Sequence, residues 1–191
     1  PGDIFTHAYA GGSRGEVIDG KINPASFRAQ KKGIVFDIGH GGASFTFRTA
    51  TQAMKEGFYA DTISTDLHVG SMNAGMKDMV NLMSKFLALG MPLKDVILKS
   101  TWKPAQVIKL EQLGHLSVGA GADVAVLRLD KGKFGFQDQR AGRMDGTERL
   151  GCELTLRDGA VVWDLNGLAA APWETIPAPA PRTPPSAGQA R

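Results

Sequence analysis

Short apolar runs alternate with stretches of helical periodicity over the first 113 residues. Runs rich in β-branched and aromatic side chains predict buried strands at residues 4–6, 34–40 and 61–66. Apolar residues spaced by three and four predict helices at 24–32, 43–56 and 74–89, with two more beginning near 91 and 101. Strands that alternate with helices predict an α/β fold with a parallel sheet and right-handed crossovers.

The periodicity changes from Gly114 onward. A strand is predicted at 124–127, and the Asp158-Gly159 pair predicts a tight hairpin turn between two further strands. The charged, Gly-containing stretch 130–149 is predicted as an exposed excursion, and the Pro- and Ala-rich end as disordered. The predicted domain organisation is 1–113 as an α/β part, 114–170 as a small β domain and 171–191 as a tail.

Composition narrows the function classes. The chain has 191 residues, 42% of them hydrophobic, and its net charge of +3 is spread without a basic stripe, which argues against a nucleic acid partner. A single cysteine, Cys152, excludes an internal disulfide, and no apolar run reaches the roughly 20 residues of a membrane helix. Without a visible signal peptide, the expected location is cytoplasmic. The early first strand suggests the later part of a longer polypeptide.

Each predicted strand of the first part ends on a side chain that can bind a metal. These side chains are His7, His40 and Asp66. Because one helix-sized crossover separates consecutive strands, all three are expected at the carboxyl edge of the sheet. Two imidazoles and a carboxylate suit Zn²⁺, with Mn²⁺ or Fe²⁺ as alternatives. Asp66 is then the expected general base towards a metal-activated water.

Two further side chains are candidates for substrate binding. His68 lies two residues beyond Asp66 and is expected on the same side, either against the metal ligand or against substrate. Arg14 lies in a loop that is either a solvated connector or a substrate-facing segment in which the guanidinium binds an anion.

The strand ends also resemble a known family. The segments 2–7, 36–42 and 64–68, together with 83–87, 103–105 and 116–127, resemble the amidohydrolase superfamily, most closely its dihydroorotase-like amidohydrolase/deacetylase branch. The resemblance covers roughly residues 1–167. It implies the later half of a (β/α)₈ TIM-like metallohydrolase barrel followed by a small β-sandwich portion.

The resemblance also implies roles. His7 and His40 would hold the second of two metal ions, and Asp66 would bind the first and act as general base and then acid. The family's His-x-His pair and bridging lysine have no counterpart in this sequence. Strand counting places Asp66 on the seventh barrel strand, whereas the family uses the eighth.

The expected function is metal-dependent hydrolysis of a small-molecule amide, either N-acyl or cyclic, or of a related ester. Two Zn²⁺ ions are expected per complete site. The sequence is compatible with a homo-oligomer. One alternative is an inactive barrel fragment that serves as a scaffold or oligomerisation module. Another is a mononuclear, deaminase-like enzyme.

Overall fold

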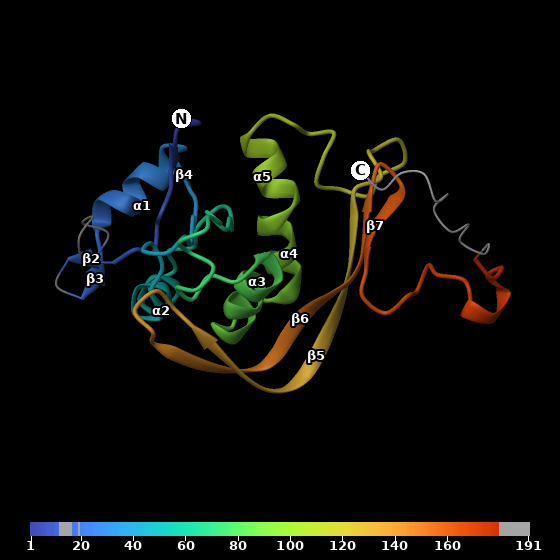
Figure 1. Cartoon of the computed structure of the whole chain (residues 1–191). Helices are drawn as coiled ribbons and strands as arrows, with labels where there is room; N and C mark the ends of the chain where they lie inside the picture. Colours follow the sequence, from blue (N-terminus) through green and yellow to red (C-terminus); the bar gives the residue numbers. More distant parts are fainter. Residues whose placement is uncertain (12–16, 19, 180–191) are drawn as a thin grey trace, which may run out of the picture.

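The computed structural model describes residues 1–11, 17–18 and 20–179 (Figure 1). Arg14 and residues 180–191 of the expected tail lie outside the described residues. The fold is α/β, as the sequence predicts. Its helices are α1 (Pro24–Lys31), α2 (Phe47–Lys55), α3 (Met79–Ala88), α4 (Leu93–Ser100) and α5 (Trp102–Val107), with a 3₁₀ turn, η1, at Trp173–Thr175.

The three predicted strands lie side by side and run parallel. β1 (Ile4–Phe5) pairs with β4 (Val35–Phe36), and Asp37 pairs with Thr62 on the other side. Backbone hydrogen bonds extend this second pairing to the strand ends: the His40 amide donates to the Ser64 carbonyl at 3.2 Å, and Gly41 to Thr65 at 2.9 Å. The chain after β4 is therefore the central strand, and the strand ends meet at one edge.

Three helices, α1, α2 and α3, begin where a polar side chain accepts a hydrogen bond from a free backbone amide. Asn23 accepts from the Ala25 amide ahead of Pro24 at the start of α1, as the sequence predicts. α2 begins at Phe47, later than the predicted residue 43, because Phe45 still pairs with Tyr9 as extended backbone. α3 begins at Met79 with Asp78 as its cap, although the apolar periodicity starts earlier.

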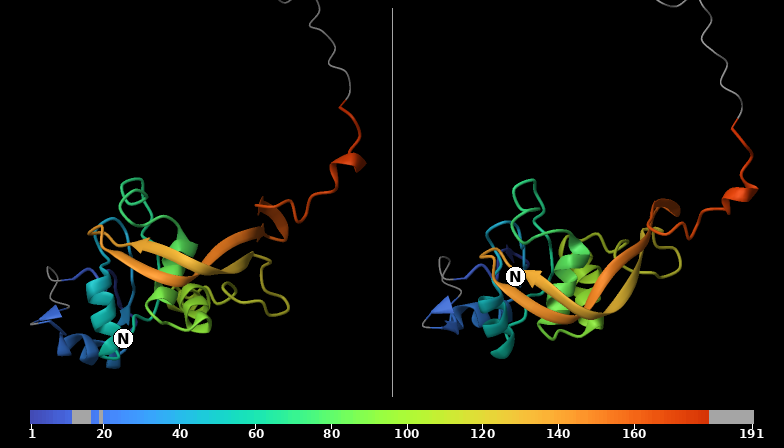
Figure 2. Two further views of the ribbon diagram at one scale, coloured as in Figure 1. Left: turned by 90° about the horizontal axis from the view of Figure 1, so that it is seen from below. Right: turned by 60° about the horizontal axis from the view of Figure 1, so that its bottom comes forward.

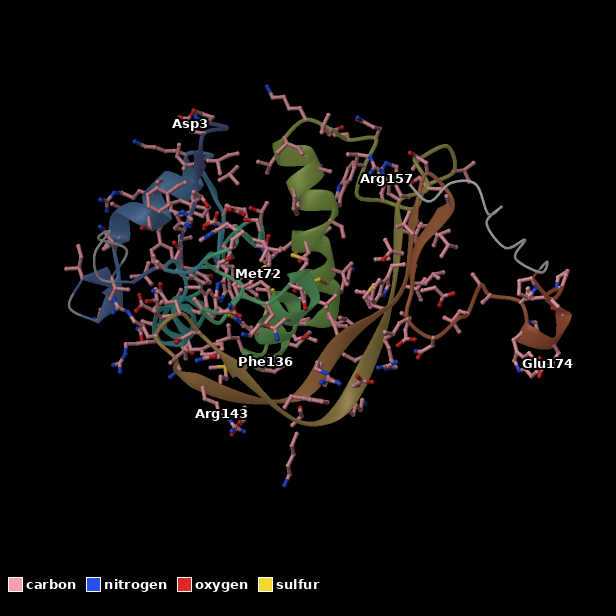
Figure 3. The ribbon with its side chains drawn as sticks, in the orientation of Figure 1. Asp3, Met72, Phe136, Arg143, Arg157 and Glu174 are labelled. Atoms are coloured by element: carbon pink, nitrogen blue, oxygen red, sulfur yellow. The ribbon has the colours of Figure 1, made fainter. Side chains whose placement is uncertain are left out.

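The stretch 130–149, predicted as an exposed excursion, is instead part of a long antiparallel hairpin. β5 (Val124–Gln137) pairs with β6 (Arg143–Arg157), and β7 (Ala160–Asp164) follows across the predicted Asp158-Gly159 turn. The hairpin curls beneath α3 and its tip reaches α2 (Figure 1). Phe136, on the stretch of hairpin below α3 in Figure 3, is 3% exposed. Most of the stretch is exposed, as predicted. Its strands were missed because a ribbon covered on one face needs few apolar residues.

One core joins the helices, the strand ends and the hairpin. Its aromatic members include the pair Phe36 and Phe58 and a cluster in which the rings of Tyr9, Phe45 and Phe86 contact one another. The Tyr9 hydroxyl donates to the Phe58 carbonyl at 2.9 Å and accepts from the Ala60 amide. The buried edge of the sheet is therefore fixed in position by packing and by hydrogen bonds.

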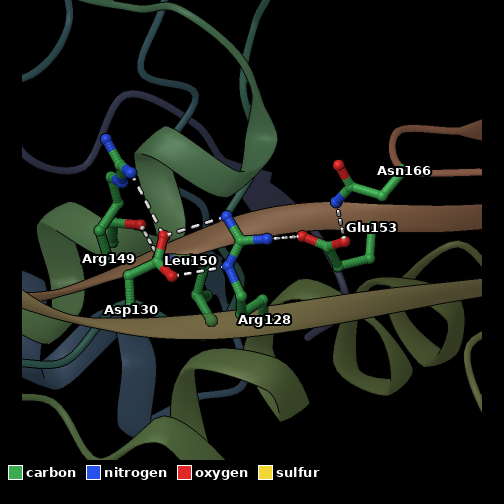
Figure 4. Close-up of polar contacts among 7 residues, drawn as sticks. Arg128, Asp130, Arg149, Leu150, Glu153 and Asn166 are labelled. Carbon is green, nitrogen blue, oxygen red and sulfur yellow. Dashed lines mark hydrogen bonds and ion pairs between the residues drawn. The ribbon is translucent and has the colours of Figure 1, made fainter.

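The solvent side of the hairpin carries an ion-pair network. Arg128 bonds Asp130 and Glu153, and Arg149 reaches Asp130 at 3.2 Å (Figure 4). Such exposed pairs contribute little to stability. Beyond β7 the chain leads away from the helices (Figure 2). In the part of the chain that the structure describes, no helix is long and apolar enough to cross a membrane.

The hairpin tip is fastened to α2 by one buried carboxylate. Asp138, 5% exposed, accepts from the backbone amides of Phe47, Arg140 and Gly142 at 2.8–2.9 Å. The Phe47 amide is one of the free donors of the α2 amino terminus, where a negative charge is favoured. The tip thus supplies one more acceptor at the start of a helix that is remote from it in sequence and whose N-cap is Thr46.

We expect Asp138→Ala to lower the free energy of unfolding by about 2–3 kcal/mol, because three amides lose a charged acceptor. The measurement is urea unfolding of the complete polypeptide encoded by the reading frame. Asp145→Ala is the matched control, since Asp145 has a 76% exposed side chain paired with Arg143 on the same hairpin. Equal unfolding midpoints for the two variants would contradict this account.

Candidate active site

A buried carboxylate joins the three strands just before they end. Asp37 accepts hydrogen bonds from Thr6 at 2.9 Å, from Thr62 at 2.6 Å and from Ser64 at 2.7 Å. The three hydroxyls come from the two segments that flank the central strand, Thr6 from the first and Thr62 and Ser64 from the third. Ser64 also accepts from the Gly39 amide at 3.2 Å. The candidate residues His7, His40 and Asp66 therefore come directly after strand segments whose positions these hydrogen bonds fix.

His7 stands on the first strand end in a left-handed backbone conformation, with φ of 68°. Its Nδ1 lies 2.6 Å from the Gly39 carbonyl oxygen. A carbonyl oxygen can only accept, so Nδ1 is the donor in this contact and Nε2 is the ring nitrogen that can bind a metal. Metal-binding histidines commonly have this arrangement, with one nitrogen bonded to a backbone carbonyl and the other directed at the metal.

Asp66 stands on the third strand end, also in a left-handed conformation, with φ of 46°. Its carboxylate lies against Gly41: a Cβ added there would stand 2.3 Å from Asp66 Oδ2. A side chain at residue 41 would displace this carboxylate, and it would also be strained, because Gly41 has φ of 48°. Non-glycine residues in this region are strained, and such strain gathers at functional sites. His7 and Asp66 thus flank one turn, residues 39–41.

His40 lies at the centre of that turn, but its side chain is fully buried. Its Nδ1 lies 2.8 Å from the Gly41 carbonyl oxygen, and its Nε2 lies 2.9 Å from Lys85 Nζ. The ring stacks on Phe45 with 4.7 Å between centroids. Burial, and then the adjacent Lys85, lower the pKa of His40 to about 4, so the ring is neutral near pH 7.

Lys85, which contacts His40, was not singled out from the sequence. It lies on α3 at 0% exposure, and its ammonium also donates to the Gly75 carbonyl at 2.6 Å. Burial lowers the pKa of Lys85 to about 8. Lysines are almost never fully buried without partners. The sequence shows a lysine on a helix that the apolar periodicity predicts to be packed against the core. It does not show which residues the lysine contacts, because they are remote in sequence.

His68 is exposed and follows Asp66 on the loop beyond the sheet edge. Its backbone amide donates to Ser71 Oγ at 2.9 Å, and its ring lies over Gly70. The structure thus places His68 beside the candidate site and open to solvent. Arg14, the other proposed substrate ligand, is outside the described residues.

The three predicted metal ligands, His7, His40 and Asp66, differ in how well they are placed to bind an ion. Among the residues that the structure describes, no three His, Cys, Asp or Glu side chains lie close enough to hold one. His7 and Asp66 fit, because both are at the sheet edge with donor atoms outside the core. His40 does not fit in this arrangement, because its Nε2 faces an ammonium. The three-ligand set of His7, His40 and Asp66 stays a prediction.

The chain is similar to known proteins of one family. The sequence profile described as "Amidohydrolase family" matches residues 46–159. A deacetylase from Brucella anthropi is 43% identical over 130 residues, which are 68% of this chain and 32% of that protein. The chain thus spans about a third of the length of this curated relative.

Two solved structures are similar in fold. A crystal structure of an adenine deaminase superposes with a TM-score of 0.81 at 31% identity, covering 85% of this chain and 45% of that one. A crystal structure of a dihydroorotase gives 0.75 at 32% identity, covering 86% and 43%. The matched profile spans more than half of the sequence, including α2, the third strand end with Asp66 and the β5–β6 hairpin. On these grounds the chain belongs to the amidohydrolase family.

Proposed function

We propose that this chain forms part of a metal-dependent hydrolase that cleaves an amide bond, or a related ester, in a small molecule. The observation that carries the proposal is the pair of side chains, His7 and Asp66, held in strained conformations on either side of the turn 39–41. Family membership supplies the class of reaction. The relatives' names favour N-acyl groups, and the dihydroorotase neighbour favours cyclic amides.

Members of this family generally use divalent metals. We propose that His7, through Nε2, and Asp66 are ligands of such an ion, with Zn²⁺ favoured by the nitrogen and carboxylate donors. When bound, the ion would acidify water and polarise the scissile carbonyl. Two donors do not complete a site. His40 stays the predicted third ligand, although its Nε2 faces Lys85 Nζ in this structure, and we propose that further ligands lie outside the described residues.

Asp66 is the proposed general base. Its carboxylate lies beyond the last backbone pairing of the strand, where a water and a substrate carbonyl can approach together. It would accept the proton of the attacking water and return it to the leaving amine. His68, exposed beside it, is the proposed contact to the substrate, and Arg14 is proposed to bind an anionic substrate group.

The proposed architecture is the later part of a (β/α)₈ barrel over residues 1–113, with residues 114–170 as a small β portion. Three parallel strands ending at one edge support this reading, as does the likeness to under half of each solved relative. Ile4 is 52% exposed on the outer edge of β1, where a preceding barrel strand would pair.

The test uses the complete polypeptide encoded by the reading frame. N-acetylated amino acids, dihydroorotate-like cyclic amides, an acyl ester and adenine are offered before and after metal removal by chelation. We expect turnover of an amide or ester, at least about 100-fold loss on chelation, and recovery with Zn²⁺ or Mn²⁺. Turnover of adenine alone would favour the deaminase alternative, and metal-free protein without turnover would favour the scaffold.

A further inference from the structure

The tip of the β5–β6 hairpin, residues 138–142, bonds to backbone that follows the first and the central strand. The Gln139 side chain donates through Nε2 to the Ala10 carbonyl at 3.3 Å. The backbone amide of Gln139 donates to the Phe45 carbonyl, also at 3.3 Å. Ala10 lies in the segment after the first strand and Phe45 in the segment after the central strand. One residue of the hairpin therefore bonds to both segments.

Asp138, the preceding residue, contacts the segments that follow the central and the third strand. Its buried carboxylate accepts from the Phe47 amide at 2.9 Å. Its backbone lies against the buried Gly75: a Cβ added to this glycine would stand 2.6 Å from the Asp138 carbonyl oxygen. Such a close approach requires a residue without a side chain. The tip, which lies beside α2 in Figure 1, thus contacts all three segments.

Short hydrogen-bonded turns connect these contact points with the strand ends. The Ala10 amide donates to the His7 carbonyl at 3.1 Å, and the Ser44 amide donates to the His40 carbonyl at 3.2 Å. The third segment contains two consecutive turns of the same kind. A shift of the tip would therefore be passed to the strand ends through backbone that has little freedom to absorb it.

We propose that the hairpin tip positions the three predicted ligands, His7, His40 and Asp66, relative to one another. Asp138 and Gln139 are then positioning residues: they act through the segments that follow the strand ends and touch neither substrate nor metal. That the three side chains bind a metal rests on the proposed function. The contacts of the tip do not, because none of them includes a predicted ligand.

The stability of the hairpin does not require these polar contacts. Phe136 and Leu150, 3% and 4% exposed, already pack the hairpin into the common core. Hydrogen bonds that replace bonds to water add little net stability, but they fix distance and direction. A catalytic site depends on such precision, since its groups must be held within about 0.5 Å of their productive positions. The tip supplies its polar groups to the three loops where this precision is needed.

The first variant is Gln139→Glu, which keeps the shape of the side chain but places a carboxylate oxygen opposite the Ala10 carbonyl. In the complete polypeptide we expect kcat to fall about 10-fold with little change in KM, because the ligands shift while substrate contacts remain. The visible spectrum of the Co²⁺-loaded protein should also change, and a loss of stability alone does not alter this spectrum. Wild-type kcat and spectrum for Gln139→Glu would overturn the proposal.

Gln137→Glu is the matched control for this variant. It makes the same chemical change two residues earlier, at an exposed side chain of the same hairpin. We expect wild-type kinetics and a wild-type Co²⁺ spectrum from it. If Gln137→Glu lowers kcat as much as Gln139→Glu does, added negative charge explains both effects and the proposal is wrong.

The contact with the third segment is tested at Gly75. Gly75→Ala adds a methyl group against the Asp138 carbonyl, and we expect kcat to fall about 10-fold or more and the Co²⁺ spectrum to change. Gly90→Ala is the control: Gly90 has φ of 91°, close to the 86° of Gly75, and no atom lies within 4 Å of an added Cβ. Both variants carry the same backbone strain. Equal kcat and equal spectra for the two would contradict the proposal.

Hydrogen exchange separates this proposal from the proposed function, because it requires neither metal nor turnover. The amides of Ala10 and Thr46 bond to backbone carbonyls next to the contact with Gln139. In Gln139→Glu they should exchange about 10-fold faster than in Gln137→Glu, as expected for the loss of one hydrogen bond. Mass spectrometry of peptides that contain these amides makes the measurement.

If the wild-type protein binds no metal and turns over none of the offered compounds, the proposed function fails and hydrogen exchange alone decides on the tip. Equal exchange in Gln139→Glu and Gln137→Glu would overturn the proposal. Faster exchange in Gln139→Glu with wild-type kcat and Co²⁺ spectrum would also overturn it, because the tip would then hold the segments without positioning the ligands.

Discussion

Replacing Asp66 by asparagine should lower kcat/KM at least about 10³-fold, because asparagine cannot accept the proton of the attacking water and is a weak metal ligand. The two side chains have the same shape, so the contact with Gly41 and the left-handed backbone at residue 66 are retained. The free energy of unfolding should therefore change little. Steady-state kinetics measure kcat/KM on whichever of the offered amides or esters the wild-type protein turns over. Urea unfolding measures the free energy of unfolding.

Asp3→Asn is the matched control for this change. Asp3 is exposed just before β1, at the opposite end of the sheet from the candidate site (Figure 3). We expect wild-type kinetics from it. An Asp66→Asn protein that keeps more than a tenth of wild-type kcat/KM would remove Asp66 from the role of general base and favour the scaffold alternative.

The placement of Asp66 and His7 follows from features that the sequence carries locally. Each stands where an apolar run gives way to small or polar residues, and parallel strands joined by helix-sized crossovers end at one edge. The Asp158-Gly159 turn and the Asn23-Pro24 start of α1 are equally local, since turn and cap chemistry depend on adjacent residues. These predictions succeed because no distant partner decides them.

The features that the sequence analysis missed depend on distant partners. Residues 130–149 form strands because they pair with each other and cover α3, which overrides their polar composition. The local sequence also does not predict that Gly39 and Gly41, both at positive φ, turn the backbone so that the His40 ring is buried. Lys85 meets His40 across 45 positions of sequence, a contact that helical periodicity does not predict.

Replacing Asp37 by alanine should have the largest effect on stability, about 3–5 kcal/mol. Three hydroxyls, from Thr6, Thr62 and Ser64, would lose a charged acceptor in partly or fully buried surroundings. These donors belong to the segments on both sides of the central strand, so the loss separates the strand ends that bear His7 and Asp66. Urea unfolding of the complete polypeptide gives the change, and metal content reports the separation of the strand ends.

Variants that each remove one of the three hydroxyl donors give the stability cost of a single hydrogen bond to Asp37. Thr6→Val, Thr62→Val and Ser64→Ala should each cost about 1–2 kcal/mol, with Ser64→Ala at the upper end, because Ser64 also accepts from the Gly39 amide. Asp37→Asn keeps one acceptor oxygen and should fall between Asp37→Ala and the single donor variants. If Asp37→Ala costs no more than one donor variant, the strands are held by their backbone pairing and by packing against Phe36 and Phe58. The carboxylate would then be replaceable without disturbing the sheet edge.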